Sequence, residues 1–314
     1  ISMQQTLQTF YQNLDQYYAA GDVDQMERFL LETEAQYRKN TAGAAQIGIA
    51  VYNELGSLYR GISRYDASIS SFQHARQLVE KEIGTDSVQY ATVLNNMAGT
   101  CRLMGHFDDA LRLFHMAEQI YARAGEEQSY AYASVLNNMS LVYRELEDLQ
   151  PAIDYLEKAL EVIQTMPNTQ QEIAITYNNL AAMYRLADNT AKAKQCVDLA
   201  MQYFDQCCEQ ENVHYAAGLN SLAGFLYAER DDERALELYQ KSAQYTKRFF
   251  GENIEYGITC RNMYWVYKRL GKRTEAMAVL EKAREIFAQA LGEDDARTCA
   301  VADDLRRLKE GVGA

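Results

Sequence analysis

The chain has 314 residues, of which 48% are apolar and two are proline, and its formal net charge is -13 at pH 7. The apolar fraction is enough to form a core, whereas so few prolines argue against a protein built of strands and tight turns. The negative charge argues against non-specific affinity for nucleic acid or an anionic membrane surface. No apolar run approaches the roughly 20 residues that span a bilayer. We therefore expect neither nucleic acid nor a membrane among its direct partners.

The reactive residue types do not form a recognisable site. The six cysteines include the adjacent Cys207 and Cys208 but no CxxC pair, so reduced thiols in a cytoplasmic protein are expected. The four histidines are scattered, without the spacing of a metal site. No Walker loop, GxSxG or HExxH motif is present. The sequence therefore predicts no enzyme activity, no metal and no cofactor.

A motif centred on asparagine recurs at a nearly constant interval. VLNNM occurs at 93–97 and again at 135–139, and related segments begin at 51, 176, 218 and 259. We name the first asparagine of each copy, or the arginine that replaces it in the last copy, the anchor. The anchors are separated by 42, 42, 41, 42 and 41 residues, and they are Asn53, Asn95, Asn137, Asn178, Asn220 and Arg261. So regular a period indicates a repeat protein.

Three regions follow one another along the chain. Residues 5–40 are expected to form a degenerate first helix pair, and residues 43–292 hold six clear repeats of 41–42 residues. Residues 294–311 are expected to form a lone closing helix with a polar outer face. We expect residues 1–314 to form a single repeat domain.

Each repeat is expected to contain two helices. A polar stretch precedes the first helix, and its candidate N-caps are Thr85, Asp86, Asn168 and Asn253. Gly105 and Gly271 are placed to take the left-handed conformation where the first helix ends. The second helix is amphipathic. Its alanines permit close approach of neighbouring helices, and they are Ala75, Ala117, Ala159, Ala200 and Ala283.

Two helices cannot enclose a core alone, so stacked pairs are needed. Larger apolar residues three positions before each alanine fill the gaps, and they are Phe72, Phe114, Leu156, Val197 and Leu280. The predicted fold is all-α, an α-α superhelix or solenoid of about seven helix pairs plus a C-terminal capping helix.

The spacing of these residues resembles that of the tetratricopeptide repeat. The pattern appears as Leu55-Gly56…Tyr59 with Phe72 and Ala75, and as Leu180-Ala181…Tyr184 with Ala193, Val197 and Ala200. The 42-residue unit with its Asn-Asn pair resembles the kinesin light chain subtype over residues 43–292. The resemblance implies that the first helices line a concave face, where the amide positions hold the backbone of a bound peptide. The heptad region of light chains is absent, so a motor role is not implied.

Positions four and seven after each anchor lie on the same stripe of the helix. The residue at position four is mostly small, and position seven carries a cation in five of six repeats. An asparagine amide pairs with a peptide main chain, and arginine binds carboxylates, so an extended acidic or C-terminal segment is the expected ligand. The predicted peptide-binding residues are Asn53, Asn95, Asn137, Asn178, Asn220, Arg60, Arg102, Arg144, Arg185, Arg261, Trp265 and Lys268.

Structural alternatives exist for several of these positions. The second asparagines are assigned to repeat packing rather than ligand binding, and they are Asn96, Asn138, Asn179 and Asn262. The arginines are alternatively solvated residues paired with acidic neighbours, as Arg144 with Glu145 or Glu147. Trp265 is alternatively a core residue. The recurring tyrosines are assigned to packing between repeats, and they are Tyr90, Tyr132, Tyr215 and Tyr256.

The sequence thus predicts a non-enzymatic scaffold or adaptor that binds a linear segment of another protein in a concave groove. One alternative is a peptide-sensing regulator, in which a short peptide changes the superhelix. Another is the scaffold or sensor part of a larger multidomain protein. The partner's identity and the oligomeric state are left open.

Overall fold

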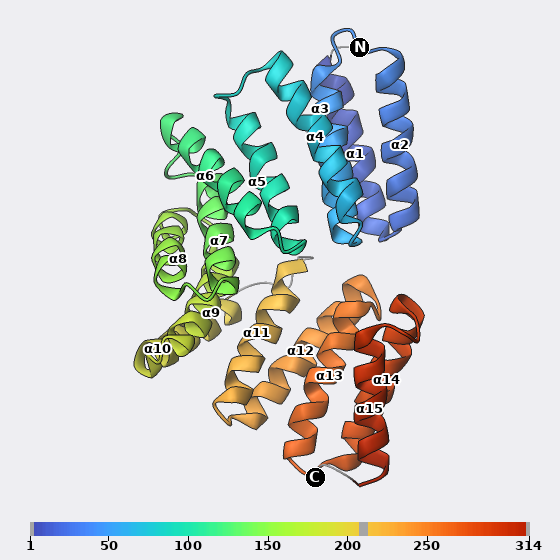
Figure 1. Cartoon of the computed structure of the whole chain (residues 1–314), viewed down its shortest axis with the longest axis vertical. Helices are drawn as coiled ribbons and strands as arrows, with labels where there is room; N and C mark the ends of the chain where they lie inside the picture. Colours follow the sequence, from blue (N-terminus) through green and yellow to red (C-terminus); the bar gives the residue numbers. More distant parts are fainter. Residues whose placement is uncertain (1–2, 207–212, 312–314) are drawn as a thin grey trace. The chain divides into compact units, whose positions relative to one another are not determined.

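The computed structural model describes residues 3–206 and 213–311, and within them it contains 15 α-helices and no strand. This confirms the predicted all-α chain of seven helix pairs followed by a closing helix (Figure 1). The helices are α1 (Met3–Ala20), α2 (Val23–Lys39), α3 (Ala45–Gly61), α4 (Tyr65–Glu82), α5 (Val88–Leu103), α6 (Phe107–Arg123), α7 (Tyr130–Glu145), α8 (Leu149–Gln164), α9 (Gln170–Leu186), α10 (Thr190–Asp205), α11 (Val213–Ala228), α12 (Asp232–Phe250), α13 (Ile254–Arg269), α14 (Arg273–Leu291) and α15 (Ala296–Lys309).

The chain divides into two compact units. Unit 1 is Ile1–Pro167 and contains α1 to α8, whereas unit 2 is Asn168–Ala314 and contains α9 to α15. The organisation of residues 1–314 as one repeat domain stays a prediction. Each unit is described by itself below.

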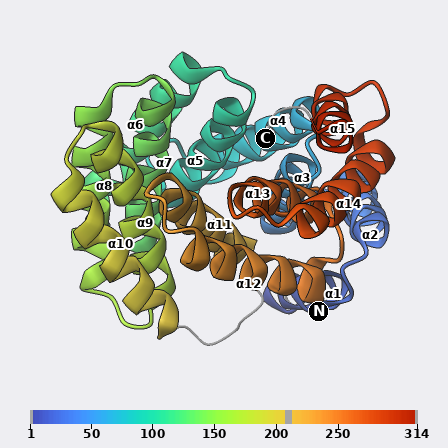
Figure 2. The same ribbon diagram turned by 90° about the horizontal axis from the view of Figure 1, so that it is seen from below.

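Helix pairs are the basic packing unit in both halves. The most extensive contacts join α3 to α4, α5 to α6 and α7 to α8 in unit 1, and α9 to α10, α11 to α12 and α13 to α14 in unit 2. Within unit 1, the first helices also touch one another in the order α1, α3, α5, α7. Figure 2 shows the successive pairs α5–α6 and α7–α8 in green. The first helices of unit 1 therefore form a continuous layer.

A left-handed residue ends the first helix of every pair. Gly105 and Gly271 have φ of 78° and 74°, which confirms their predicted role. The same turn is made in other repeats by residues that are not glycine, namely Ser63, Glu147, Asp188 and Arg230. The N–H after the left-handed residue donates to the carbonyl five positions earlier, as His106 does to Cys101 at 2.9 Å. This is the Schellman arrangement, which satisfies carbonyls that the helix leaves unpaired.

The helix starts agree with the predicted N-caps at one position only. Asn253 caps α13, and its side chain accepts from the N–H of Tyr256 at 3.0 Å. Thr85 and Asp86 do not cap α5, because Ser87 takes that position and accepts from the Tyr90 N–H. Asn168 is also not a cap. Its φ is 59°, and Thr169 is the residue that precedes α9.

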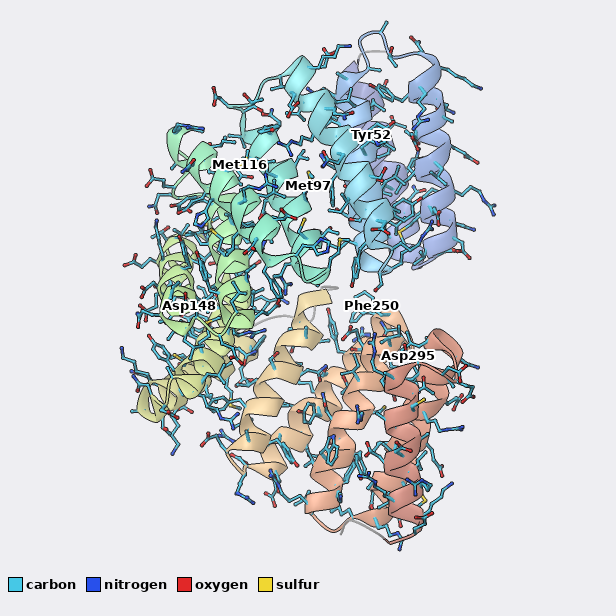
Figure 3. The ribbon with its side chains drawn as sticks, viewed as in Figure 1. Tyr52, Met97, Met116, Asp148, Phe250 and Asp295 are labelled. Atoms are coloured by element: carbon cyan, nitrogen blue, oxygen red, sulfur yellow. The ribbon has the colours of Figure 1, made fainter. Side chains whose placement is uncertain are left out.

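The core lies between the two helices of each pair and between successive pairs. Phe72 and Ala75 of α4 are fully buried, as are Phe114 and Ala117 of α6. A methyl group at Gly56 of α3 would lie 2.5 Å from the Phe72 ring, so glycine is required where these helices meet. Figure 3 labels Tyr52 of α3, whose ring stacks on His74 of α4 with centroids 4.9 Å apart. Small residues on one helix thus receive large rings from its partner.

Candidate functional site

Two parallel rows of polar side chains run across the first helices of unit 1. The anchor row is Asn53, Asn95 and Asn137, and the cation row is Arg60, Arg102 and Arg144. Each helix supplies one member of each row, from α3, α5 and α7, which are adjacent. The anchor and the cation are seven residues apart, which is about two turns of one helix. The structure therefore brings together the unit 1 members of the predicted site.

The asparagines of the anchor row differ in their hydrogen bonds. Asn95 Oδ1 accepts from Nδ2 of Asn138 at 3.2 Å, which links α5 to α7. The Oδ1 atoms of Asn53 and Asn137 are buried and accept no hydrogen bond. Their amide nitrogens make no hydrogen bond to a described residue and are not buried, so each group offers donors to a ligand. Asn138 thus contacts the adjacent first helix, as expected of a second asparagine, and its partner there is the first asparagine Asn95. The assignment of Asn53, Asn95 and Asn137 to ligand binding stays a prediction.

The cation row contains three guanidinium groups and one acidic partner. Arg102 Nη1 lies 2.6 Å from Oε1 of Glu145, which belongs to the next first helix. Arg60 donates to the backbone carbonyl of Asn96 at 3.3 Å. The Arg144 guanidinium forms neither an ion pair nor a hydrogen bond with any residue that the structure describes. Glu145 therefore forms its ion pair with Arg102, whereas the structural alternative pairs Arg144 with Glu145 or Glu147.

The arginines also influence one another. Burial, together with the charge of Arg102, lowers the pKa of the Arg60 guanidinium. Burial lowers the pKa of Arg144, where Glu145 acts in the opposite direction and Arg102 in the same direction. Both effects place Arg102 within electrostatic range of its two neighbours in the row. The row is therefore a local concentration of positive charge on a protein whose net charge is -13.

The asparagines of unit 2 are engaged in packing between repeats. Asn178 is 2% exposed, and its Nδ2 donates to the Gly218 carbonyl of α11 at 3.1 Å. Asn220 Nδ2 donates to Thr259 Oγ1 of α13 at 2.8 Å. The prediction that Asn178 holds a ligand backbone is contradicted by this burial, because its amide is already bonded and shielded from solvent.

The cations of unit 2 are mostly paired. Arg185 Nε lies 3.6 Å from Oε1 of Glu229, and Arg261 Nη2 lies 3.1 Å from Oδ2 of Asp304. Lys268 lies over the Trp265 ring, 5.7 Å from its centroid. Trp265 is 36% exposed, so it is not the core residue that the alternative supposed.

The recurring tyrosines pack between helices. Tyr90, Tyr132 and Tyr215 are buried. The Tyr90 hydroxyl donates to Glu80 of the preceding helix α4 at 2.9 Å. Tyr256 is half-buried near the start of α13.

Sequence reasoning missed the acidic residues that pair with these cations. Glu145, Glu229 and Asp304 each lie 43 or 44 residues after their arginine. An acidic residue about one repeat period after each arginine is the sequence signal that identifies these partners. The same register places Asp303 and Asp304 of α15 where earlier repeats have Asn-Asn.

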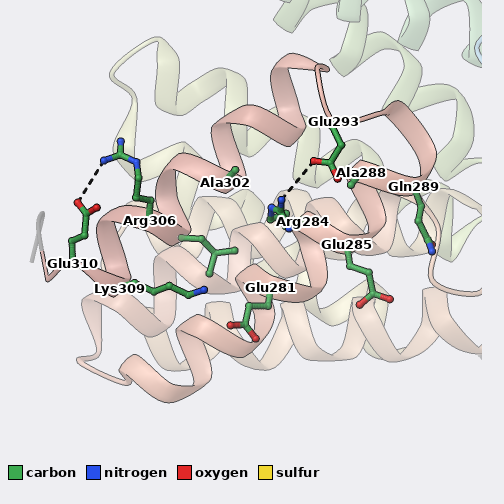
Figure 4. A pocket seen from close by; sticks show the side chains of 11 residues that line it. Glu281, Arg284, Glu285, Ala288, Gln289, Glu293, Ala302, Arg306, Lys309 and Glu310 are labelled. Carbon is green, nitrogen blue, oxygen red and sulfur yellow. Dashed lines mark hydrogen bonds and ion pairs between the residues drawn. The ribbon is translucent and has the colours of Figure 1, made fainter.

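A surface cavity with a volume of about 810 Å³ lies between α14 and α15. Its walls are mainly charged, as Figure 4 shows. Arg284 pairs with Glu293 at 3.6 Å, and Arg306 pairs with Glu310 at 3.5 Å. Leu305 is buried below them. A charged face with internal pairs is typical of the terminal helix of a repeat array and favours solvation over ligand binding.

Other kinds of site are not evident in residues 3–206 and 213–311. No group of three or more His, Cys, Asp or Glu residues there is arranged to hold a metal ion. Within the same residues, none of the helices combines the length and the apolar character required to cross a membrane. Cys101, Cys260 and Cys299 are free thiols. Cys207 and Cys208 lie outside the described residues.

Comparison with known proteins identifies family models and solved structures that this chain resembles. Tetratricopeptide repeat family models match residues 49–123, 107–165 and 265–297. The sequence matches no curated protein. Among solved structures, BtubC (BKLC) from P. vanneervenii is 23% identical, with a TM-score of 0.58, and the match covers 66% of this chain and 84% of BtubC.

Two further structures match nearly the whole chain. Rap protein complexed with Competence and Sporulation Factor is 14% identical, with a TM-score of 0.65 and coverage of 96% of this chain and 85% of Rap. The quorum sensor NprR from B. thuringiensis is 18% identical, with a TM-score of 0.60 and coverage of 100% and 84%. At these identities the likeness is one of fold. The family matches show that residues 49–165 and 265–297 hold tetratricopeptide repeats, and the seven helix pairs agree with that repeat fold.

Proposed function

We propose that the chain is a non-catalytic scaffold that binds an extended, acidic peptide segment along the anchor row and the cation row of unit 1. The observation that carries this proposal is the unbalanced charge of the cation row. Of these three arginines only Arg102 forms an ion pair, with Glu145, and the Arg144 guanidinium has no ion-pair or hydrogen-bond partner among the described residues. Partly buried guanidinium groups without acids attract carboxylates from a ligand.

The spacing of the rows suits an extended ligand. Packed helices lie roughly 8–10 Å apart, and an extended chain advances about 3.3 Å per residue. About three residues of peptide thus span the distance from one arginine to the next. The free amide donors of Asn53 and Asn137 are available for main-chain carbonyls, which would make binding tolerant of the ligand's other side chains.

The relatives support a peptide ligand. One NprR structure, with a TM-score of 0.64, is described as a complex with its cognate peptide NprX. This resemblance over the whole chain favours, as a second candidate, a regulator that senses a short peptide. Both candidates require the same peptide site and differ in whether binding changes the protein's own conformation.

The test is isothermal titration of acetyl-EGGEGGEGG-amide, with glutamates at three-residue spacing, and of the same peptide with glutamine at each glutamate. We expect the glutamate peptide to bind at least about tenfold more tightly at low salt, with a difference that shrinks as salt screens the charges. Arg144→Gln should weaken that binding about fivefold. The matched control is Arg112→Gln, which changes an exposed arginine on the second helix α6. Equal affinity for the two peptides would refute the proposed function.

A further inference from the structure

The first helix of unit 1 extends the site by one repeat, although its sequence lacks the motif. Counting back 42 residues from Asn53 and Arg60 gives Tyr11 and Tyr18. Both belong to α1, which packs against α3 (Figure 1). Their side chains are 40% and 42% exposed. The anchor row and the cation row therefore continue on α1 as two exposed phenol rings.

Two carboxylates lie beside these rings. The Tyr18 hydroxyl donates to Oε2 of Glu54 at 3.5 Å. Asp15 of α1 lies close enough that its charge acts on both Tyr18 and Glu54. Burial raises the pKa of Glu54, and Asp15 adds to this effect, whereas the hydrogen bond from Tyr18 opposes it. Asp15 thus places a second negative charge near the carboxylate of Glu54, which is already partly desolvated.

No cation of the described chain compensates these acids. Neither Asp15 nor Glu54 forms an ion pair with a residue in the described ranges, and the first 27 residues contain no lysine, arginine or histidine. The only basic residue of α3 is Arg60, which donates to the Asn96 carbonyl on α5. Arg60 therefore separates a negative, aromatic edge on α1 and α3 from a positive row that continues onto α5 and α7.

We propose that this edge, formed by Tyr11, Asp15, Tyr18 and Glu54, binds a cationic side chain of the same peptide whose carboxylates contact the cation row. This inference rests on the proposed function and specifies its ligand as a segment with opposite charges at its two ends. The carboxylates supply charge, and the phenol rings supply faces that attract an ammonium or guanidinium group. Charge complementarity along the rows thus fixes which end of the segment lies on α1.

The distance from the edge on α1 to the cation row determines the spacing of charges in the test peptide. The step from α1 to α3 is one helix spacing, which again corresponds to about three extended residues. We therefore compare acetyl-KGGEGGEGGEGG-amide with acetyl-QGGEGGEGGEGG-amide by titration calorimetry. An ion pair and a cation–π contact at a partly exposed site together predict about tenfold tighter binding of the lysine peptide.

Substitutions in the edge test whether these residues cause the preference for the lysine peptide. The double variant Asp15→Asn with Glu54→Gln should bind the two peptides with affinities within about twofold of each other. Its affinity for acetyl-QGGEGGEGGEGG-amide should stay close to that of the wild-type protein. Tyr18→Leu should reduce the lysine preference by a few fold. The matched control is Asp86→Asn, because Asp86 is an acid 91% exposed in the turn before α5 and outside both rows. Thermal unfolding of each variant verifies that unit 1 stays folded.

The outcomes separate this inference from the proposed function. If acetyl-QGGEGGEGGEGG-amide binds and the lysine peptide binds no more tightly, the proposed site for a cationic side chain is refuted, whereas binding of acidic segments stands. A lysine preference that survives the double variant also refutes it, since the cation would then lie elsewhere. If neither peptide binds, the proposed function fails and this inference fails with it.

Discussion

Glu145 occupies, within the protein, the place that a ligand carboxylate would take on Arg102. Its Oε1 lies 2.6 Å from Arg102 Nη1, and the two side chains are 29% and 22% exposed. An acidic peptide must therefore displace Glu145 or share Arg102 with it. Replacing Glu145 with glutamine keeps the size of the side chain and removes the competing charge. We predict that this substitution increases affinity for the acidic peptide.

The magnitude follows from the exposure of the pair. An ion pair that is partly open to solvent contributes about 0.2–1 kcal/mol. Loss of that contribution lowers the melting temperature by about 4 °C at most for a unit of this size. In the variant the ligand no longer has to break this ion pair, so binding becomes more favourable by the same free energy. Because 1.4 kcal/mol is a factor of ten in affinity, the affinity rises by up to about fivefold. The variant is thus expected to be slightly less stable and to bind more tightly.

The assay is calorimetric titration with the glutamate peptide, together with differential scanning calorimetry. Glu147→Gln is the matched control, because it removes the same charge two residues away, from an acid that has no ion pair within the described chain. A general electrostatic effect would change both variants equally. If Glu145→Gln binds no more tightly than Glu147→Gln, Glu145 does not compete with the ligand, and Arg102 is a packing residue.

The helix pairs could be predicted because their signals are local. Apolar spacing and a 42-residue period are properties of the chain itself, and they require no knowledge of the neighbouring helix. The sequence predicts the left-handed turns only where glycine marks them. At Ser63, Glu147, Asp188 and Arg230 the Schellman bonds impose the same conformation on residues that carry no signal for it.

The candidate site was less predictable because it depends on relations between repeats. A helical projection separates first and second asparagines by 100°, yet it does not show where the next helix lies. In the structure Asn95 reaches Asn138, and Asn178 reaches the backbone of α11. The charge pairs were missed for the same reason. The sequence places acids next to Arg144, whereas Arg102 and Arg185 pair with acids one repeat further on.

Three further predictions test the packing described here. Gly56→Ala should destabilise unit 1 by about 1–3 kcal/mol, because the added methyl group meets the Phe72 ring. Gly61→Ala is the control, since no atom lies within 4 Å of its added methyl group. Equal chemical denaturation midpoints for the two variants would contradict this prediction. Fluorescence of Trp265, the single tryptophan, should be quenched by acrylamide in the folded protein, since a core residue would be shielded. Asn178→Ala should lower stability by about 1–2 kcal/mol, because it removes a buried amide and deprives the Gly218 carbonyl of a donor. Asn179→Ala is its control, since that neighbour makes no hydrogen bond through its side chain to the described residues. The helix propensity of alanine favours both substitutions equally, so the difference between their melting temperatures measures the hydrogen bond and the packing around it. A variant at Asn178 that melts at or above wild type would show that this amide is dispensable to the interface, and would restore it as a candidate ligand contact.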